Sequence, residues 1–512
     1  MKNVFTIVCR GSWLSLAQVE LFKSKVAKYF PAVELKTLIK ETKGDREQST
    51  PLHLIEGKDF FTAEIQEDLR SGKADFAVHS MKDVSGDHFF EQSFYRILDR
   101  DDIRDVVIFN KNIIEKLKNN QPIVIGTSSP RRTKMATAFL QKALPQFSES
   151  PIDLQTKPIR GNVDGRLKKL SDTGEFDGIV LAMAGLNRLL AFEQSKQTVQ
   201  LLLSDKKIMV LPLFECPPAA GQGAIVAETN IDNLDAIEVL TQITDKENTI
   251  AIQEERLIAN TYGYGCSQPF GVFHLSTPTI AFTYAAGTNI QEENFTEWHY
   301  KLPELNANQI IFSGSDYMKD FFTETYLEHT KIDSSSKALF IASHKCLHNT
   351  KLIQNANNKR VWVAGSKTWL ALAKKGIWVE GSADGLGLES ILPTMNNSLM
   401  QLSKNQFTIL TNNNSVVNWL ADGYDAVASY TLHPSIQSTI IKEIAAADFI
   451  FWASFQQYQI AHQYAKPTAL HACASGKSAD RLMQLGIRPF IFPTIKAFIA
   501  WKAKATLATA AE

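Results

Sequence analysis

Residues 122–144, PIVIGTSSPRRTKMATAFLQKAL, join a short apolar run to an amphipathic stretch. The apolar run predicts a buried strand, and Ser129 followed by Pro130 predicts the N-cap and the first turn of a helix. A helix N-terminus presents free N–H groups, and the consecutive Arg131 and Arg132 add donors that suit a carboxylate or a phosphate. The pattern therefore predicts either an anion site at the end of a strand or a capped helix with solvated arginines.

The same order of strand, polar loop and helix recurs along the first 225 residues. Apolar residues at helical spacing predict a helix over 16–30, and the apolar runs that predict strands are VFTIV (4–8), DFAVH (75–79) and GIVLAMAG (178–185). Alternation of this kind is typical of mostly parallel α/β sheets, whose functional loops lie at the carboxyl ends of the strands.

The remainder of the chain predicts two further regions. Residues 230–305 combine a predicted helix near 234–260 with β-like runs such as TIAFTYAAG, which indicates a small α+β domain. From about residue 306 the alternation resumes, with ALFIAS, FTILTN and DFIFWAS as predicted strands, which indicates another α/β unit. The length of 512 residues is consistent with about three domains of ordinary size.

The composition, 44% hydrophobic and 21% charged, is that of an ordinary globular protein. Lys+Arg and Asp+Glu are both 54, and this balance argues against a general nucleic-acid-binding protein. No run approaches the ~18–20 apolar residues of a transmembrane helix, so we expect no membrane partner. The five cysteines lack a CxxC pair or zinc spacing, which predicts a cytoplasmic location with neither a disulfide framework nor a metal site.

Arginines follow four separate predicted strands. In a parallel sheet the ends of these strands meet at one edge, so the arginines should converge on one cleft. Any single arginine is equally well explained as a surface charge, but the set predicts a ligand with several carboxylates. Besides Arg131 and Arg132, the set contains Arg10 after VFTIV, Arg160 and Arg166 in PIRGNVDGRLKK (158–169), and Arg188 after GIVLAMAG, with Gly161 allowing a tight turn.

Two polar pairs lie close to predicted strands. Lys82 and Asp83 come shortly after DFAVH. An acidic side chain beside basic groups stays charged and can stabilise a cation or move a proton, although an ordinary loop ion pair would look the same. Ser15 and Gln18 fit a capping box, which predicts that Gln18 only closes a helix.

Cys266 lies between glycines in YGYGCSQPFG, residues 262–271. Glycine on both sides lets the backbone take positive φ and leaves room for a bulky group. The stretch therefore predicts a thiol that carries or attacks something large, and the alternative is a buried free cysteine.

Eight segments of the first 300 residues together resemble the hydroxymethylbilane synthase family, also called porphobilinogen deaminase. They occur in the family's order: RGSWLSLAQ, GKDFFTAEIQ, DFAVHSMKDV, GTSSPRR, PIRGNVDGRL, AMAGLNRL, PPAAGQGAI and GYGCSQPFG. The resemblance implies two α/β lobes, similar to periplasmic-binding-protein domains, around a cleft, and a small α+β domain that bears a cofactor. It implies domain 1 over 1–98 completed by 195–225, domain 2 over 99–194, and domain 3 over 226–304.

The resemblance also implies a reaction and the residues that perform it. The enzyme would condense four molecules of porphobilinogen on a dipyrromethane attached to Cys266 through a thioether, and then hydrolyse the product free. Asp83 and Lys82 are the implied catalytic residues, and we expect a monomer. The implied cofactor contacts are Lys58, Ser80, Asp45, Thr127, Ser128, Ser129, Arg131, Arg132, Arg160 and Gly161. The implied substrate contacts are Arg10, Ser12, Gln18, Phe61, Arg166 and Arg188.

Residues 305–512 resemble uroporphyrinogen-III synthase. The matching segments are KRVWVAGSKTWLALAKKGI, YTLHPS (430–435), DFIFWASFQQ (448–457) and ASGKSADRLMQLGI (474–487). The resemblance implies an α/β region that inverts ring D of the linear tetrapyrrole and closes the macrocycle. Loop hydroxyls and helix N-termini suit carboxylates, and the candidate contacts are Thr368, Tyr430, Ser454 and Ser478.

Two other interpretations fit the same residues. Two α/β lobes around an anion cleft also describe solute-binding proteins, because a fold alone does not give a function. Such a protein would need neither Asp83 nor Cys266, so alanine at either position would leave ligand binding intact. The C-terminal region fits equally well as a non-catalytic docking module.

Overall fold

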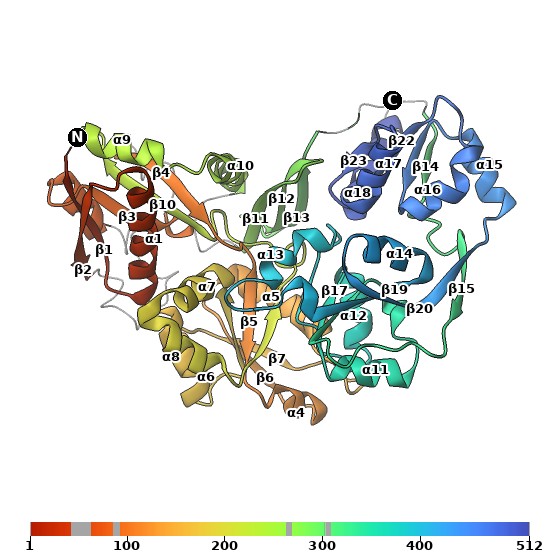
Figure 1. Ribbon diagram of the computed structural model, residues 1–512, viewed down its shortest axis with the longest axis horizontal. Helices are drawn as coiled ribbons and strands as arrows, with labels where there is room; N and C mark the ends of the chain where they lie inside the picture. Colours follow the sequence, from red (N-terminus) through yellow and green to blue (C-terminus); the bar gives the residue numbers. More distant parts are fainter. Residues whose placement is uncertain are drawn as a thin grey trace. The chain divides into compact units, whose positions relative to one another are not determined.

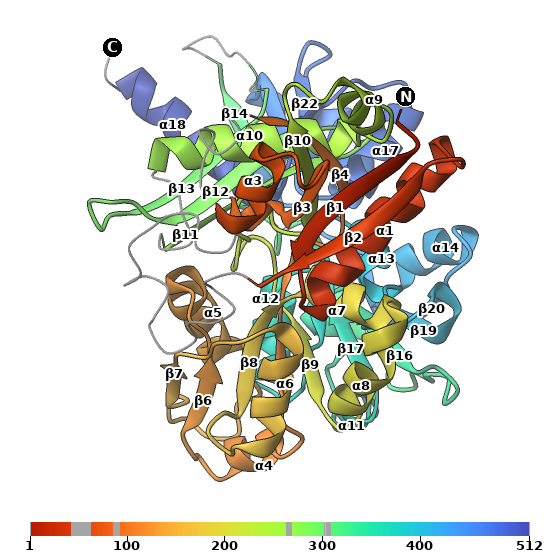
Figure 2. The ribbon, with the colours of Figure 1, turned by 90° about the vertical axis from the view of Figure 1, so that its left-hand side faces the viewer.

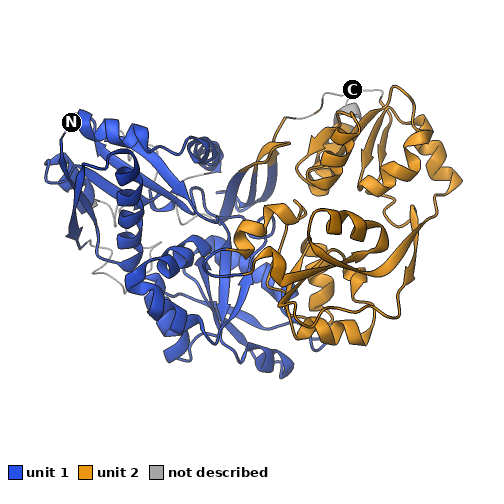
Figure 3. Cartoon of the chain, in the orientation of Figure 1, with its two compact units in different colours: residues 1–274, 284–297, 397–401 blue, residues 275–283, 298–396, 402–512 orange. Residues whose placement is uncertain are grey.

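The computed structural model describes residues 2–41, 63–84, 93–262, 269–301, 303 and 309–510. The chain forms two compact units (Figure 3). Unit 1 contains residues 1–274, 284–297 and 397–401, and unit 2 contains residues 275–283, 298–396 and 402–512. The predicted site residues Asp45, Lys58, Phe61 and Cys266 lie outside the described residues.

The first sheet of unit 1, here called lobe 1, has the strand order β2-β1-β3-β10-β4. Its strands are β1 (Val4–Arg10), β2 (Glu34–Lys40), β3 (Phe76–Ser80), β4 (Ser93–Arg100) and β10 (Ala224–Asn230). β1 is parallel to β2 and β3, whereas β10 is antiparallel to β3 and β4. Helix α1 (Trp13–Tyr29) packs on β1 and β3 (Figures 1 and 2), where Phe5, Phe22 and Phe76 form a fully buried aromatic cluster.

The second sheet of unit 1, here called lobe 2, has the order β7-β6-β8-β5-β9. Its strands are β5 (Asp105–Phe109), β6 (Ile123–Gly126), β7 (Leu154–Lys157), β8 (Gly178–Ala182) and β9 (Lys207–Val210). Its helices are α4 (Ile113–Lys118), α5 (Pro130–Ala143), α6 (Val163–Asp172), α7 (Met183–Ala191) and α8 (Glu193–Leu203). β6, β7 and β8 are parallel, as the alternation predicts, but β5 is antiparallel to both β8 and β9, so the sheet is mixed.

The chain passes between the lobes twice. It leaves lobe 1 after β4 through residues 101–104 and returns through residues 211–223 before β10. The return is later than the boundary at residue 195 that the sequence predicts, because β9 pairs with β5 and buries Met209 and Val210 in lobe 2.

A three-stranded sheet, β11-β12-β13, follows two helices. The helices are α9 (Leu234–Gln242) and α10 (Lys246–Tyr262), and the strands are β11 (Phe270–Ser276), β12 (Ala281–Thr288) and β13 (Asn294–His299). The predicted single helix near 234–260 is therefore divided. α9 ends at Gln242, and Asp245 begins α10, because its carboxylate accepts a hydrogen bond from the backbone N–H of Asn248 at 3.0 Å.

Unit 2 contains two α/β sheets, as the alternation after residue 306 predicts. The six-stranded sheet has the order β15-β20-β19-β16-β17-β18, and the four-stranded sheet, β14-β21-β22-β23, is parallel throughout. The strands are β14 (Ile311–Ser313), β15 (Phe322–Tyr326), β16 (Ala338–Ile341), β17 (Arg360–Val363), β18 (Gly381–Ser382), β19 (Phe407–Asn412), β20 (Asp425–Pro434), β21 (Phe449–Trp452), β22 (Leu470–Ala474) and β23 (Phe490–Phe492).

The helices of unit 2 cover these two sheets (Figure 1). They are α11 (Thr350–Asn357), α12 (Ser366–Ala373), α13 (Leu392–Met395), α14 (Asn413–Ala421), α15 (Ser438–Ala446), α16 (Phe455–Ala461), α17 (Lys477–Gln484) and α18 (Ile495–Ala510). In the part of the chain that the structure describes, no helix combines the length and the apolar character needed to span a bilayer.

Candidate active site

A pocket of about 240 Å³ lies in unit 1, with residues of both lobes in its wall. Five of the six predicted arginines line it. Arg132, Arg160, Arg166 and Arg188 come after the neighbouring parallel strands of lobe 2, as expected, whereas Arg10 ends β1 of the other sheet. The predicted site residues in the wall are Arg10, Ser12, Ser80, Lys82, Asp83, Arg132, Arg160, Gly161, Arg166 and Arg188. The other lining residues are Leu14, Asn162, Val163, Leu181, Ala182, Ala184, Gly185, Gly223 and Ala224.

Asp83 reaches the pocket from a single 3-10 turn, Met81–Asp83, directly after β3. Met81 is fully buried, which anchors the turn and leaves Lys82 and Asp83 in the pocket wall. Gly221 approaches this turn so closely that a Cβ atom there would lie 2.8 Å from Cγ of Met81. With φ of +73°, position 221 also has a backbone conformation that favours glycine.

The loop between β7 and α6 contributes Arg160 and Arg166. Gly161 has φ of +113°, which accounts for glycine at the predicted tight turn. Its carbonyl oxygen accepts a hydrogen bond of 2.8 Å from Nε of Arg166, so the turn and the first turns of α6 fix that guanidinium. Both arginines therefore enter the pocket from a constrained backbone.

The capping box predicted for Ser15 and Gln18 is wrong. The N-cap of α1 is Ser12, whose side chain accepts from the backbone N–H of Ser15 at 3.3 Å. Gln18 is buried and donates through Nε2 to the hydroxyl of Ser80 at 2.8 Å, so it links α1 to the end of β3. The prediction failed because Ser80 lies 62 residues away and no local signal reveals it.

The consecutive arginines of GTSSPRR have different roles. Ser129 is the N-cap of α5 as predicted, and its hydroxyl accepts from the backbone N–H of Arg132 at 3.5 Å. Arg132 lines the pocket, but Arg131 is buried away from the pocket wall, where it donates to the carbonyl oxygen of Pro217 at 2.7 Å. One arginine thus faces the ligand space, and the other binds the second crossover between the lobes.

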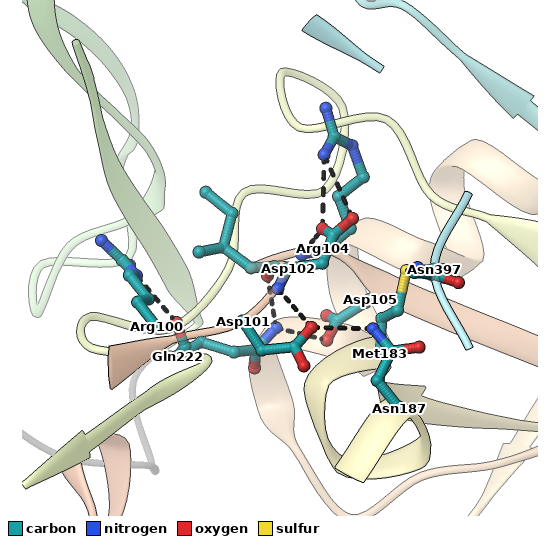
Figure 4. Close-up of polar contacts among 10 residues, drawn as sticks. Arg100, Asp101, Asp102, Arg104, Asp105, Met183, Asn187, Gln222 and Asn397 are labelled. Atoms are coloured by element: carbon teal, nitrogen blue, oxygen red, sulfur yellow. Dashed lines mark hydrogen bonds and ion pairs between the residues drawn. The ribbon is translucent and has the colours of Figure 1, made fainter. Parts of the chain in front are cut away.

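Asp105, drawn beside Gln222 in Figure 4, compensates the charges of both arginines. Its carboxylate lies 2.8 Å from Nη1 of Arg131 and 2.7 Å from Nη2 of Arg132, and it accepts from Nε2 of Gln222 at 2.9 Å. Burial alone would raise the pKa of this carboxyl, but the two guanidinium groups outweigh it and hold the pKa well below its usual range.

The pocket is strongly electropositive. Burial, and to a smaller extent the charges of Arg132 and Arg160, lower the pKa of Arg166 to about 10, and the charge of Asp83 opposes this shift. Among the described residues, Nε of Arg132, Nη1 of Arg160 and Nε of Arg188 are buried and have no hydrogen-bond partner. Buried N–H donors of this kind require acceptors, and carboxylates are the natural ones.

The hydroxyls of Thr127 and Ser128 in GTSSPRR form hydrogen bonds with backbone groups of this loop and of the β7–α6 loop. Ser128 donates to the carbonyl oxygen of Ile159 at 2.8 Å and accepts from its N–H at 3.0 Å, which joins the β6–α5 loop to the β7–α6 loop. Thr127 accepts from the N–H of Ser129 at 3.3 Å. Thr127, Ser128 and Ser129 are not among the residues that line the pocket.

Sequence analysis did not identify Glu255 of α10. This carboxylate is fully buried, pairs with Arg100 at 2.8 Å, and accepts from the backbone N–H groups of Gly221 and His274, each at 2.9 Å. It therefore connects the helix before the Cys266 stretch to β4 and to the second crossover. In the sequence it is one acidic residue in an amphipathic helix, so no signal distinguishes it.

The candidate residues of unit 2 occupy two places. Thr368 and Tyr430 are buried beside the six-stranded sheet, and burial raises the pKa of Tyr430. Ser454 and Ser478 accept from the backbone N–H groups of Gln457 and Phe455, at 3.2 Å each, so they stabilise helix starts at the four-stranded sheet. The structure thus brings the two serines together but does not group all four residues.

Residues 5–238 match the family model "Porphobilinogen deaminase, dipyromethane cofactor binding domain". The chain is 34% identical to porphobilinogen deaminase of Rickettsia typhi over 313 residues, 61% of this chain and 92% of that protein. For the Ehrlichia canis protein the identity is 33% over 320 residues, 62% of this chain and 97% of that protein.

Among solved structures, uroporphyrinogen-III synthetase from Helicobacter pylori 26695 matches with a TM-score of 0.25 and 13% identity. The match covers 36% of this chain and 91% of that one. The relatives from Rickettsia and Ehrlichia, in contrast, are matched over nearly their whole length. The chain therefore belongs to the porphobilinogen deaminase family, and residues 5–238 form that family's dipyrromethane cofactor binding domain.

Proposed function

We propose that the chain is a hydroxymethylbilane synthase, which joins four porphobilinogen molecules and releases the linear tetrapyrrole. The observation that carries this proposal is the pocket in which five arginines surround a single turn bearing Asp83. Porphobilinogen has an acetate and a propionate side chain, so a growing oligopyrrole adds two carboxylates with every unit. Guanidinium groups bind such carboxylates through charge-assisted, often bidentate, hydrogen bonds.

The same pocket fits a dipyrromethane with its four carboxylates. The buried, unpartnered N–H groups of Arg132, Arg160 and Arg188 are the donors that these carboxylates need. Cys266 would hold the group through a thioether, and Lys82 and Ser80 would add polar contacts from the end of β3. When bound, the dipyrromethane supplies the pyrrole α-carbon to which the first substrate unit is joined.

Asp83 is the proposed catalytic residue. Loss of ammonia from porphobilinogen leaves a cationic pyrrole, and a carboxylate in the pocket wall stabilises such a cation. When the free α-carbon of the terminal pyrrole attacks this cation and the new carbon–carbon bond forms, that α-carbon loses its proton, and the Asp83 carboxylate is the acceptor that we assign.

Arg160→Ala tests the carboxylate-binding role. We expect kcat/KM for porphobilinogen to fall about 10- to 100-fold, because a hydrogen bond to a charged group is typically worth about 1.5–3 kcal/mol. The measurement is steady-state release of ammonia and bilane. Arg70→Ala is the matched control, since Arg70 is an exposed arginine of unit 1 that pairs only loosely with Glu67.

The same assay separates the enzyme from a solute-binding protein. A binding protein would retain porphobilinogen without releasing ammonia, and its affinity would not depend on Asp83. If Arg160→Ala and Arg70→Ala turn over porphobilinogen equally well, the assigned role of the pocket is wrong.

We further propose that residues 305–512 cyclise the product to uroporphyrinogen III. The observation in favour is that Gln456 of α16 donates to Asn412 at 3.3 Å, which joins the two sheets of unit 2 beside buried Tyr430. Tyr430 interacts with Asn412 and is a weakly acidic hydroxyl in a desolvated place, suited to assist loss of water from the bilane.

Tyr430→Phe in the full chain tests this second activity. The parent protein should convert porphobilinogen to the type III isomer, whereas Tyr430→Phe should release bilane that cyclises unaided to type I. Separation of the two isomers after oxidation to uroporphyrin gives the ratio. Truncation at residue 304 is unsuitable, because unit 1 includes residues 397–401. A parent protein that yields only type I would make the region a docking module instead.

A further inference from the structure

Asn397–Gln401 is a short turn that belongs to compact unit 1, although the residues on both sides of it belong to unit 2. Asn397 closes the turn, because its side-chain oxygen accepts from the N–H groups of Leu399 and Met400 at 3.0 and 2.9 Å. Leu399 and Met400 are buried, and Gln401 has φ of +47°. The turn, called the 397–401 turn below, is therefore an ordered element that buries apolar side chains.

This turn binds one face of α7 (Figure 4). Nδ2 of Asn397 donates to Sδ of Met183 at 3.1 Å, and the N–H of Leu399 donates to Oδ1 of Asn187 at 3.3 Å. Met183 and Asn187 are four residues apart, so they lie on the same side of the helix. Both are buried in the folded chain.

The same two α7 residues also hold the first crossover between the lobes. Nδ2 of Asn187 donates to Oδ1 of Asp101 at 2.7 Å, and the backbone N–H of Met183 donates to the carbonyl oxygen of Arg104 at 3.0 Å. Asp101 in turn donates its backbone N–H to Gly223 in the second crossover, at 3.1 Å. A continuous chain of hydrogen bonds therefore runs from the 397–401 turn to both connections between lobe 1 and lobe 2.

Asparagine at position 187 satisfies two opposite requirements. The carboxylate of Asp101 accepts from Asn187, and the N–H of Leu399, which is shared with Oδ1 of Asn397, donates to Asn187. An amide offers a donor and an acceptor at once, whereas a carboxylate at position 187 would face that of Asp101 and an apolar side chain would remove the link between Leu399 and Asp101. These hydrogen bonds fix the orientation of the Asn187 amide, so Asn187 links Leu399 to Asp101.

We propose that the 397–401 turn braces the crossover between the lobes, with Asn187 as the positioning residue that transmits the restraint to Asp101. The proposal rests on the proposed function: one pocket lined by both lobes must accept a bound chain that lengthens by one pyrrole at a time, and we expect the lobes to move apart as it does. A segment of the C-terminal half of the chain would then restrain that movement. Coupling of this kind is reciprocal, so ligand in the pocket also changes the stability of the turn.

Hydrogen exchange of the full-length holoprotein tests the brace with Asn397→Ala. This variant removes two hydrogen bonds within the turn and one to Met183 but touches no residue of the crossover. We expect peptides covering 99–105 to exchange about two- to tenfold faster, the effect of losing roughly one net hydrogen bond. Asn396→Ala is the matched control, because Asn396 is exposed and lies one residue before the turn.

Asn187→Asp provides a second, independent variant. It retains an acceptor for Leu399 but sets two carboxylates against each other, so exchange over 99–105 should accelerate at least as much as in Asn397→Ala. In the parent protein, addition of porphobilinogen should change exchange over 395–402. Faster exchange confined to 395–402 in Asn397→Ala would overturn the proposal.

The outcomes separate the brace from the proposed function. If porphobilinogen adds mass to the protein and yet leaves exchange at both segments unchanged in parent and variant, the brace is refuted and the synthase activity stands. If porphobilinogen adds no mass, the proposed function fails, while the comparison of Asn397→Ala with Asn396→Ala still decides whether the turn restrains the crossover.

Discussion

Asp83→Asn lowers the turnover of porphobilinogen about 10²- to 10⁴-fold, the usual contribution of a positioned acid or base. The substitution keeps the shape of the side chain but removes its charge, so the cationic intermediate loses its counter-ion and the departing proton loses its acceptor. Release of ammonia under saturating substrate gives the rate, expressed per molecule that carries the covalent oligopyrrole by intact mass.

Asp172→Asn is the control for this experiment. Asp172 is an exposed carboxylate at the end of α6, in the same unit but away from the pocket wall, and its loss changes the net charge equally. We expect it to leave turnover unchanged. A rate for Asp83→Asn within about threefold of the control, less than a hydrogen bond's usual effect, would show that another group moves the proton.

Asp105→Ala is the substitution with the largest expected effect on stability. It leaves the buried guanidinium groups of Arg131 and Arg132 without their anion, and breaking a buried ion pair in this way typically costs about 3–5 kcal/mol. The urea dependence of hydrogen exchange in a peptide spanning 105–109 reports the free energy of unfolding of lobe 2. Asp172→Ala serves as the exposed control, and a loss below about 1 kcal/mol would contradict the assignment.

The pH dependence of the free energy of unfolding of lobe 2 gives a second test, because the pKa shift of Asp105 fixes its direction. Because the pKa of Asp105 is lower in the folded protein than its unfolded value of about 3.9, the unfolded state binds the proton more readily. The contribution of Asp105 is therefore complete above about pH 5 and is lost as the pH falls below about 4. In Asp105→Asn the free energy of unfolding of lobe 2 should fall less steeply as the pH drops below about 4. In Asp172→Asn it should fall as steeply as in the parent protein.

Local patterns in the sequence predict much of the fold. Ser129 and Pro130 begin α5 as their cap chemistry requires, and Gly161 adopts the positive φ that a tight turn needs. Arg132, Arg160 and Arg188 meet in one pocket because the ends of the neighbouring parallel strands β6, β7 and β8 are adjacent, whereas Arg10 reaches the same pocket from the sheet of lobe 1. Each of these features depends on a few consecutive residues or on sheet geometry alone.

Features that depend on distant partners could not be predicted. Arg131 and Arg132 are adjacent residues of the same type and both pair with Asp105. Arg131 lies away from the pocket wall, where it donates to the carbonyl oxygen of Pro217, 86 residues later in the chain. Gln18 fits a local capping pattern, yet its amide binds Ser80 on another strand. The attachment of the 397–401 turn to Asn187 spans 212 residues and has no sequence pattern at either end.

The intact mass of the purified protein tests the central claim most directly. The account predicts an excess over the chain mass equal to two porphobilinogen molecules less two ammonias, because each thioether or pyrrole link forms with loss of one ammonia. This excess should be absent from Cys266→Ser. Protein purified without the excess should acquire it on incubation with porphobilinogen. A chain mass that stays unmodified after that incubation would contradict the account.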